Sequence, residues 1–139
     1  MGTRADNNII YNDGHFSLLP MNDWGSKSDM VKIAAKSITF DKICSIHNIT
    51  NIEYLQIDME GFDSEIIKMI DLSKYKINKI RFEKWGFQTE SFTNYHKEKA
   101  YELGINGMNN SINKLKEYNY SINEINDCDG NDIIATLNV

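Results

Sequence analysis

Three carboxylates, Asp58, Glu60 and Glu83, are the residues whose types and spacing best fit a chemical role. Asp58 and Glu60 come directly after a short apolar run, and Glu83 ends a second such run 25 residues after Asp58. A carboxylate can remove a proton from a hydroxyl group, attract a positively charged ligand or help to hold a divalent cation. The sequence therefore predicts an acidic site, provided that the fold brings these side chains together.

The segment around Asp58 predicts a strand, a sharp turn and a helix. Residues 54–58 form a short run of strand-forming residues, and Gly61 permits a tight turn or the close approach of a ligand. Asp63 and Glu65 fall in the first turn of the expected helix, where the helix dipole favours carboxylates. Apolar residues at helical spacing predict its buried face: Phe62, Ile66, Met69 and Ile70.

A second strand is expected at residues 78–83, where Ile80 and Phe82 alternate with charged residues. The separation of Asp58 and Glu83 is that of a strand–helix–strand unit, whose crossover makes the two strands parallel. Ligands of open α/β sheets bind beyond the carboxyl ends of the strands. We therefore expect the three carboxylates to meet at one edge of an α/β sheet.

The upstream part of the chain carries weaker patterns. Residues 1–30 are expected to be largely irregular, with a short strand end at 9–11 and a turn at 12–14. Residues 31–40 predict a strand, because apolar and polar side chains alternate there.

A short helix is expected at residues 42–47, capped by Thr39 or Asp41. Its apolar residues, Ile43 and Ile46, are expected to face the core. His47 is interpreted as a solvated residue at the C-terminal end of this helix, where a positive charge is favoured.

The downstream part predicts further helical and strand segments. Residues 84–107 look like an aromatic insertion, with a helix at 92–103 that Gly104 and Gly107 would end. A second helix is expected from Met108 to Asn119, with Asn109 or Asn110 as its cap. The chain should close with an antiparallel hairpin of residues 121–125 and 131–137 around a turn at 128–131.

The composition argues against several classes of protein. A formal net charge of −5 and the lack of a basic stripe argue against nucleic acid as a partner. Nothing approaches the ~18 apolar residues of a membrane span, and the N-terminus lacks the apolar segment of a signal peptide. Cys44 and Cys128 are interpreted as reduced thiols, so a cytoplasmic location is expected.

Residues 55–63, Leu-Gln-Ile-Asp-Met-Glu-Gly-Phe-Asp, resemble the signature (K/Q)-I-D-(V/T)-E-G-(A/Y/F)-(E/D) of the FkbM family of S-adenosylmethionine-dependent methyltransferases. Residues 37–43 are similar to the upstream pattern (T/S)-I-T-(L/F)-D-x-(L/I), and residues 80–83 to a downstream strand that ends in Glu. The order and spacing of the three segments match the family, over roughly residues 30–137.

The resemblance implies a Rossmann-like class I methyltransferase fold with a terminal antiparallel hairpin. It also implies S-adenosylmethionine as the cofactor and O-methyl transfer to a hydroxyl group of a sugar or natural product, so the partner would be a small-molecule or glycan acceptor. In this interpretation Asp58, Glu60 and Glu83 are catalytic, and no metal ion is required. The residues expected to contact the cofactor are Asp58, Met59, Glu60 and Gly61, with Trp24 or Trp85 as a wall of the pocket.

One expected feature of such a fold is missing from the sequence. Rossmann-like methyltransferases normally hold their cofactor with a Gly-x-Gly turn after the first strand, and no two of the eight glycines form that pair. We therefore expect residues 31–139 to be the C-terminal part of a methyltransferase domain, either truncated or reduced. Such a chain should bind S-adenosylmethionine weakly or not at all. Its unpaired strand edge should make it marginally stable or prone to self-association.

Other interpretations stay open at this point. The three carboxylates could have structural roles alone. In that case Asp58 would cap the following helix, Glu60 would be a solvated turn residue, and Glu83 would pair with Lys84 or Arg81. The same carboxylates would suit Mg²⁺ in a hydrolase or phosphotransfer enzyme. The chain could also be a non-catalytic remnant or an assembly module that pairs with a separate cofactor-binding chain.

Overall fold

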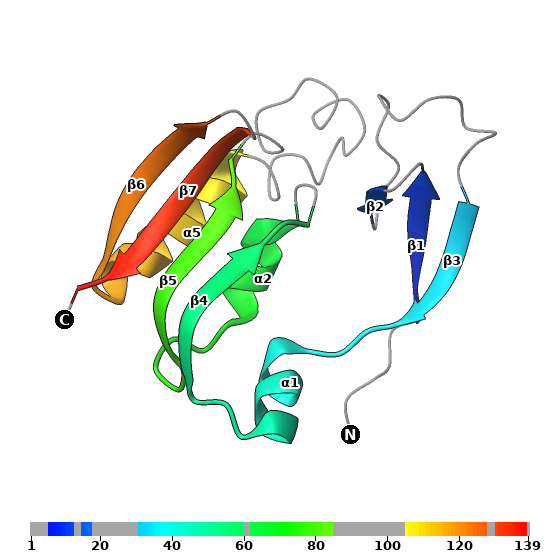
Figure 1. Ribbon diagram of the computed structural model, residues 1–139, viewed down its shortest axis with the longest axis horizontal. Coiled ribbons are helices and arrows are strands. Elements are labelled where there is room, and N and C mark those ends of the chain that lie inside the picture. Colours follow the sequence, from blue (N-terminus) through cyan, green and yellow to red (C-terminus); the bar gives the residue numbers. More distant parts are fainter. Residues whose placement is uncertain are drawn as a thin grey trace.

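The computed structural model describes residues 6–12, 15–17, 31–59, 62–84, 105–127 and 130–138. These residues form an α/β structure with a mixed four-stranded sheet and a smaller three-stranded sheet (Figure 1). Predictions that fall on Trp24, Trp85, Cys128 and the helix at 92–103 lie outside the described residues. Among the helices that are described, none is long and apolar enough to cross a membrane.

The four-stranded sheet has the strand order β4-β5-β7-β6. Its strands are β4 (Asn51–Ile57), β5 (Lys76–Glu83), β6 (Tyr120–Asp127) and β7 (Gly130–Leu137). β4 and β5 are parallel, and β7 runs antiparallel to both β5 and β6. The predicted parallel pair and the predicted terminal hairpin are therefore both confirmed.

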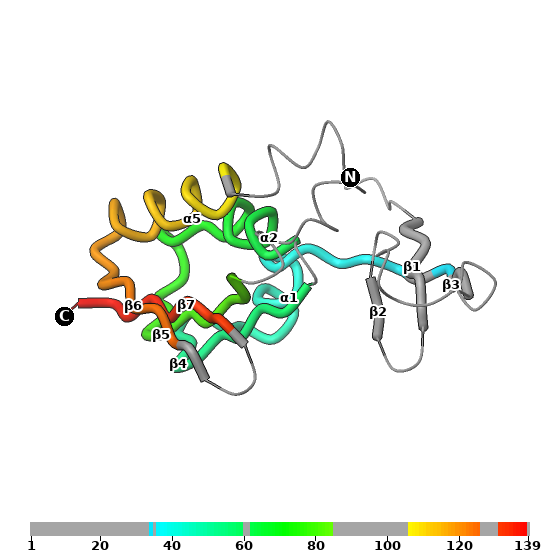
Figure 2. The backbone as a smooth tube through the Cα atoms, turned by 90° about the horizontal axis from the view of Figure 1, so that it is seen from above, coloured from blue at the N-terminus to red at the C-terminus, as the bar shows by residue number. Residues whose placement is uncertain are grey.

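Two helices, α2 (Asp63–Met69) and α5 (Ile105–Glu117), cover one face of this sheet (Figures 1 and 2). Side chains alternate between the two faces of a strand, so every second residue points toward these helices. Burial of these apolar side chains drives the packing. The buried core includes Ile57, Ile80, Phe82, Ile133 and Ala135 of the sheet, Ile67 and Leu115 of the helices, and Ile70 directly after α2.

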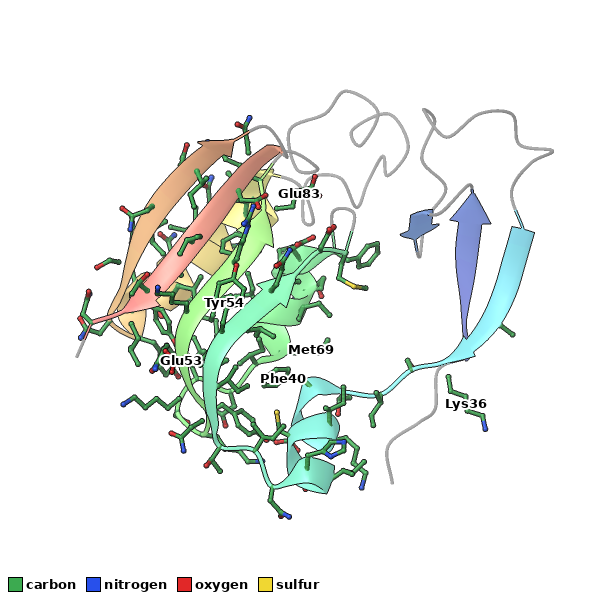
Figure 3. The ribbon with its side chains drawn as sticks, in the orientation of Figure 1. Lys36, Phe40, Glu53, Tyr54, Met69 and Glu83 are labelled. Atoms are coloured by element: carbon green, nitrogen blue, oxygen red, sulfur yellow. The ribbon has the colours of Figure 1, made fainter. Side chains whose placement is uncertain are left out.

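α2 is present as predicted, but its buried face is rotated by one residue. Asp63, Ile67 and Ile70 point inward at helical spacing, whereas Met69 is 52% exposed. The prediction that Met69 faces the core is therefore wrong. Figure 3 labels Met69 beside α2. The rotation also places Asp63, which was expected only to lie in the first turn of the helix, in the interior.

α1 (Phe40–His47) begins where Thr39 caps it, as one of the two predicted caps. The Thr39 hydroxyl accepts a hydrogen bond from the Lys42 N–H at 3.2 Å. Ile43 and Ile46, expected in the core, are 40% and 54% exposed, so that prediction is wrong. The buried side is instead formed by Cys44 and the partly buried Phe40.

Contacts of α1 with the segment before β5 explain this orientation. The ring of Phe40 packs edge-on against Tyr75, with centroids 5.4 Å apart. Asp41 accepts a hydrogen bond from the Tyr75 hydroxyl at 2.5 Å and forms an ion pair with Lys74. His47 lies exposed at the C-terminal end of α1, as predicted.

α5 starts three residues earlier than predicted. Asn109 and Asn110 lie within α5, so neither is its N-terminal cap. Gly107 also lies within α5, so the prediction that it ends an earlier helix is wrong. The buried stripe of α5 runs back from Leu115 through Ser111 to Gly107. The Ser111 hydroxyl donates a hydrogen bond to the Gly107 carbonyl at 3.0 Å. Because its hydroxyl is bonded within the helix, Ser111 can occupy a buried position that an apolar residue would usually fill.

The three-stranded sheet is antiparallel and has the order β2-β1-β3. It consists of β1 (Asp6–Asn12), β2 (His15–Ser17) and β3 (Val31–Lys36). The strand predicted within residues 31–40 is thus present, and β1 is its partner. Residues 1–30, expected to be largely irregular, contain two strands, one of which includes the suggested strand end at 9–11.

Candidate functional site

The carboxyl ends of β4 and β5 bring Asp58 and Glu83 together. Ile57 pairs with Phe82 across the parallel strands, so Asp58 and Glu83 occupy neighbouring positions at one sheet edge. Figure 3 shows Glu83 at the end of β5. Both residues line a pocket of about 220 Å³, and its described lining residues are Gln56, Ile57, Asp58, Arg81, Glu83 and Asp132.

Glu60 and Gly61, the other sequence-predicted site residues, lie outside the described residues. Met59, expected to contact a cofactor, is 37% exposed. Its backbone N–H donates to a carboxylate oxygen of Asp63 at 3.4 Å. Asp58 is exposed and Glu83 is half-buried. The described part of the structure thus unites two of the three predicted carboxylates.

Strand alternation explains the polar lining of the pocket. Gln56 pairs with Arg81 and Glu83 pairs with Asp132, so these side chains share the sheet face opposite the helices. Arg81 forms an ion pair with Asp132, and this carboxylate, helped by Tyr54, raises the pKa of Arg81. The pocket therefore contains three carboxylates and one guanidinium, which is already bonded to one of them.

Asp63 adds a fourth carboxylate directly behind this pocket. It is fully buried, with 0% of its surface exposed. Its two oxygens accept hydrogen bonds from the backbone N–H groups of Met59 at 3.4 Å and Glu83 at 3.3 Å. Burial raises the pKa of Asp63 to about 6; these N–H donors lower it in part, and the charge of Asp58 raises it further.

Two of the alternative interpretations can be compared with this geometry. α2 starts after Phe62 without any side-chain capping bond, so the interpretation of Asp58 as the helix cap is wrong. For the suggested pairing of Glu83 with Lys84, the structure shows that Lys84 forms an ion pair with Glu124. Within the described residues, no group of three or more His, Cys, Asp or Glu side chains is arranged to hold a metal ion, so the Mg²⁺ interpretation gains no support there.

Sequence reasoning missed four residues around the pocket. Gln56 and Arg81 precede Asp58 and Glu83 by two positions, and strand alternation would have placed them on the same face. Asp132 could be added only once the β5–β7 register was known. Asp63 occupies the last position of the motif at residues 55–63, but its burial carried no signal in the pattern.

A larger pocket of about 400 Å³ lies between α2 and α5. Its described lining residues are Ser64, Glu65, Lys68, Asn106, Gly107, Asn110, Ser111 and Lys114. The Lys114 ammonium donates to the carbonyls of Ile67, Lys68 and Ile70 at 2.9, 2.8 and 2.7 Å. Its three protons are thus used to cap the C-terminal end of α2, so this cation has a structural role.

Among the described residues, the acidic pocket is where carboxylates predicted from the sequence to do chemistry come together. In comparisons with known proteins, a model of the methyltransferase FkbM domain matches residues 3–126. Searches of curated proteins and of solved structures gave no match. The family match spans most of the chain and includes the motif that ends β4, the crossover helix and β5. The chain therefore belongs to the family of methyltransferases with an FkbM domain.

Proposed function

We propose that this chain carries the methyl-acceptor side of an S-adenosylmethionine-dependent O-methyltransferase site, with Asp58 and Glu83 as its central carboxylates. The observation that supports the proposal is the convergence of these two residues in one pocket at the ends of parallel strands. The family resemblance implies a sugar or natural-product hydroxyl as the acceptor.

The sheet topology supports a Rossmann-like class I fold for the complete domain. Two parallel strands followed by an antiparallel hairpin, in the order β4-β5-β7-β6, are consistent with the C-terminal half of that fold. In open α/β sheets, ligands bind beyond the carboxyl ends of the parallel strands. Asp58 and Glu83 occupy that position.

The different burial of Glu83 and Asp58 suggests a different role in methyl transfer for each. Bound S-adenosylmethionine would supply the methyl group from a positively charged sulfonium. Glu83 has one carboxylate oxygen buried, and we assign to it the removal of the proton from the acceptor hydroxyl group. Asp58 is exposed at the pocket, where it would accept a hydrogen bond from the acceptor and orient it.

The charge of the pocket suits a cationic cofactor. Asp58, Glu83 and Asp132 exceed the single charge of Arg81, so a sulfonium or an ammonium group would be attracted there. The 139 residues contain no Gly-x-Gly turn to hold an adenosine, so we expect the acidic edge alone to give weak binding. Met59, Glu60 and Gly61 remain proposed cofactor contacts.

An assay of methyl transfer from radiolabelled S-adenosylmethionine to a panel of hydroxylated acceptors tests the proposal. The protein should be purified from the cells that naturally produce it. Asp58→Asn and Glu83→Gln should each lower the rate by about 100-fold or more, the usual contribution of acid–base catalysis. Glu117→Gln, on the exposed surface of α5, is the matched control and should change it less than about twofold. Full activity of both site variants, or no transfer to any hydroxylated acceptor, would overturn the proposal.

A further inference from the structure

Asp63 links the two strand ends that carry the candidate site. One carboxylate oxygen accepts the N–H of Met59, the residue directly after Asp58, and the other accepts the N–H of Glu83. The carboxylate is fully buried and belongs to α2, the helix that connects the two strands.

We propose that Asp63 is a positioning residue, which holds the backbone after β4 against the end of β5 and so sets the separation of the Asp58 and Glu83 carboxylates. The proposal about position stands on the geometry of Asp63. Its catalytic consequence rests on the proposed function, because the two carboxylates matter to the rate only if they act on a methyl acceptor.

The bonding of Asp63 requires its ionised form. An ionised carboxylate only accepts hydrogen bonds, whereas a protonated one gains an O–H donor and cannot serve two N–H groups equally well. Because burial raises the pKa of Asp63 to about 6, this change falls close to physiological pH. Loss of a proton should therefore tighten the link, and gain of a proton should release at least one strand end.

The charged groups around Asp63 are consistent with this assignment. Asp58 after β4 raises the pKa of Asp63, and Glu83 at the end of β5 lies beside the bond that it donates. Lys84 is paired with Glu124 of β6, and on α2 itself Glu65 is paired with Lys68. Two further cations lie on the elements that pack around α2. Arg81 of β5 is paired with Asp132 of β7, and Lys114 of α5 bonds to carbonyls at the opposite end of α2.

Amide NMR of the uniformly labelled chain between pH 4 and 8 tests the link. The N–H resonances of Met59 and Glu83 should move with one shared midpoint near pH 6, while the N–H of Ile80, buried in β5, should stay unchanged. Asp63→Asn should abolish both movements, and Asp71→Asn, an exposed control beyond α2, should preserve them. Different midpoints for the two amides, or movements that persist in Asp63→Asn, would overturn the proposal.

Two further measurements keep the proposal decidable. If Asp63→Asn does not fold, the shared or separate midpoints of the unmodified chain decide the question alone. In the methyl-transfer assay, Asp63→Asn should lower kcat by about 10- to 100-fold with little change in KM. In the natural chain kcat should fall as the pH drops through about 6, and Asp63→Asn should remove this fall. Because the NMR midpoints need no activity, coupled amides without methyl transfer would refute the proposed function and leave the link standing. An unchanged pH profile in an active Asp63→Asn enzyme would refute the positioning role.

Discussion

Replacement of the buried Asp63 by Asn should remove a specific pH dependence of stability. The pKa of Asp63 is about 6 in the folded chain and has an ordinary value of 3.8. At about 1.4 kcal/mol per pH unit, this difference corresponds to about 3 kcal/mol of unfolding free energy. Because the pKa is raised on folding, the folded state holds the proton more tightly, so the stabilisation is fully present below about pH 4 and is lost as the pH rises through about 6.

Urea unfolding followed by circular dichroism, at several pH values from 4 to 7.5, measures this effect. The unfolding free energy of the natural chain minus that of Asp63→Asn should fall by about 2.4 kcal/mol between pH 4 and pH 7, which is most of the total. Titrating groups that do not interact with Asp63 cancel in this difference. A difference that stays flat, or that grows as the pH rises, would refute the burial of an ionisable Asp63.

Asp71→Asn provides a control of opposite sign. Hydrogen bonds from Ser73 lower the pKa of Asp71 below its ordinary value of 3.8. A lowered pKa means that the stabilisation is present at neutral pH and is lost as the pH falls. The same subtraction for Asp71→Asn should therefore show a loss of stabilisation toward low pH.

Three more predictions concern stability and association. Lys114→Met should lower the unfolding free energy by about 2–3 kcal/mol, because three carbonyls at the end of α2 lose their charged donor, whereas Lys116→Met on the exposed surface should have little effect. Tyr120→Phe should cost about 1–2 kcal/mol in the same urea assay, since the Ile77 carbonyl loses its 2.6 Å bond, and the exposed Tyr118→Phe should cost less than about 0.5 kcal/mol. β4 ends the described sheet, so light scattering should show self-association at high concentration, and a clean monomer would contradict it.

The sequence predicted the parts of the fold that depend on strong local patterns. The two apolar runs and their 25-residue separation were sufficient to predict β4 and β5 as parallel neighbours, and hence the meeting of Asp58 and Glu83. The terminal hairpin followed from two strand patterns around a turn. These features depend on periodicity and chain connectivity, which a single sequence contains.

Helix orientation was less predictable, because short helices offer more than one apolar stripe. In α2, apolar residues occur at 62, 66, 67, 69 and 70, which allows two orientations one residue apart, and packing selected the one that buries Asp63 and Ile67. In α1, the contact of Phe40 with Tyr75 outweighed the stripe of Ile43 and Ile46.

The buried polar contacts of the site could not be predicted from sequence. The partners of Asp63 are backbone N–H groups of Met59 and Glu83, which are available to any residue that folding brings near. Asp132 reaches the pocket only through the register of β7 against β5. Such contacts depend on tertiary geometry and leave no periodic pattern.

Chemical-shift mapping of the labelled chain with millimolar S-adenosylmethionine tests the proposed site most directly, because it detects even weak binding. The largest amide shifts should lie at the ends of β4 and β5, at Asp58, Met59, Glu83 and Lys84, and Asp58→Asn should reduce them. S-adenosylhomocysteine, which lacks the positive charge of the sulfonium, should produce smaller shifts there. Shifts confined to the pocket between α2 and α5, or no shifts at all, would contradict a cofactor site at the acidic edge of the sheet.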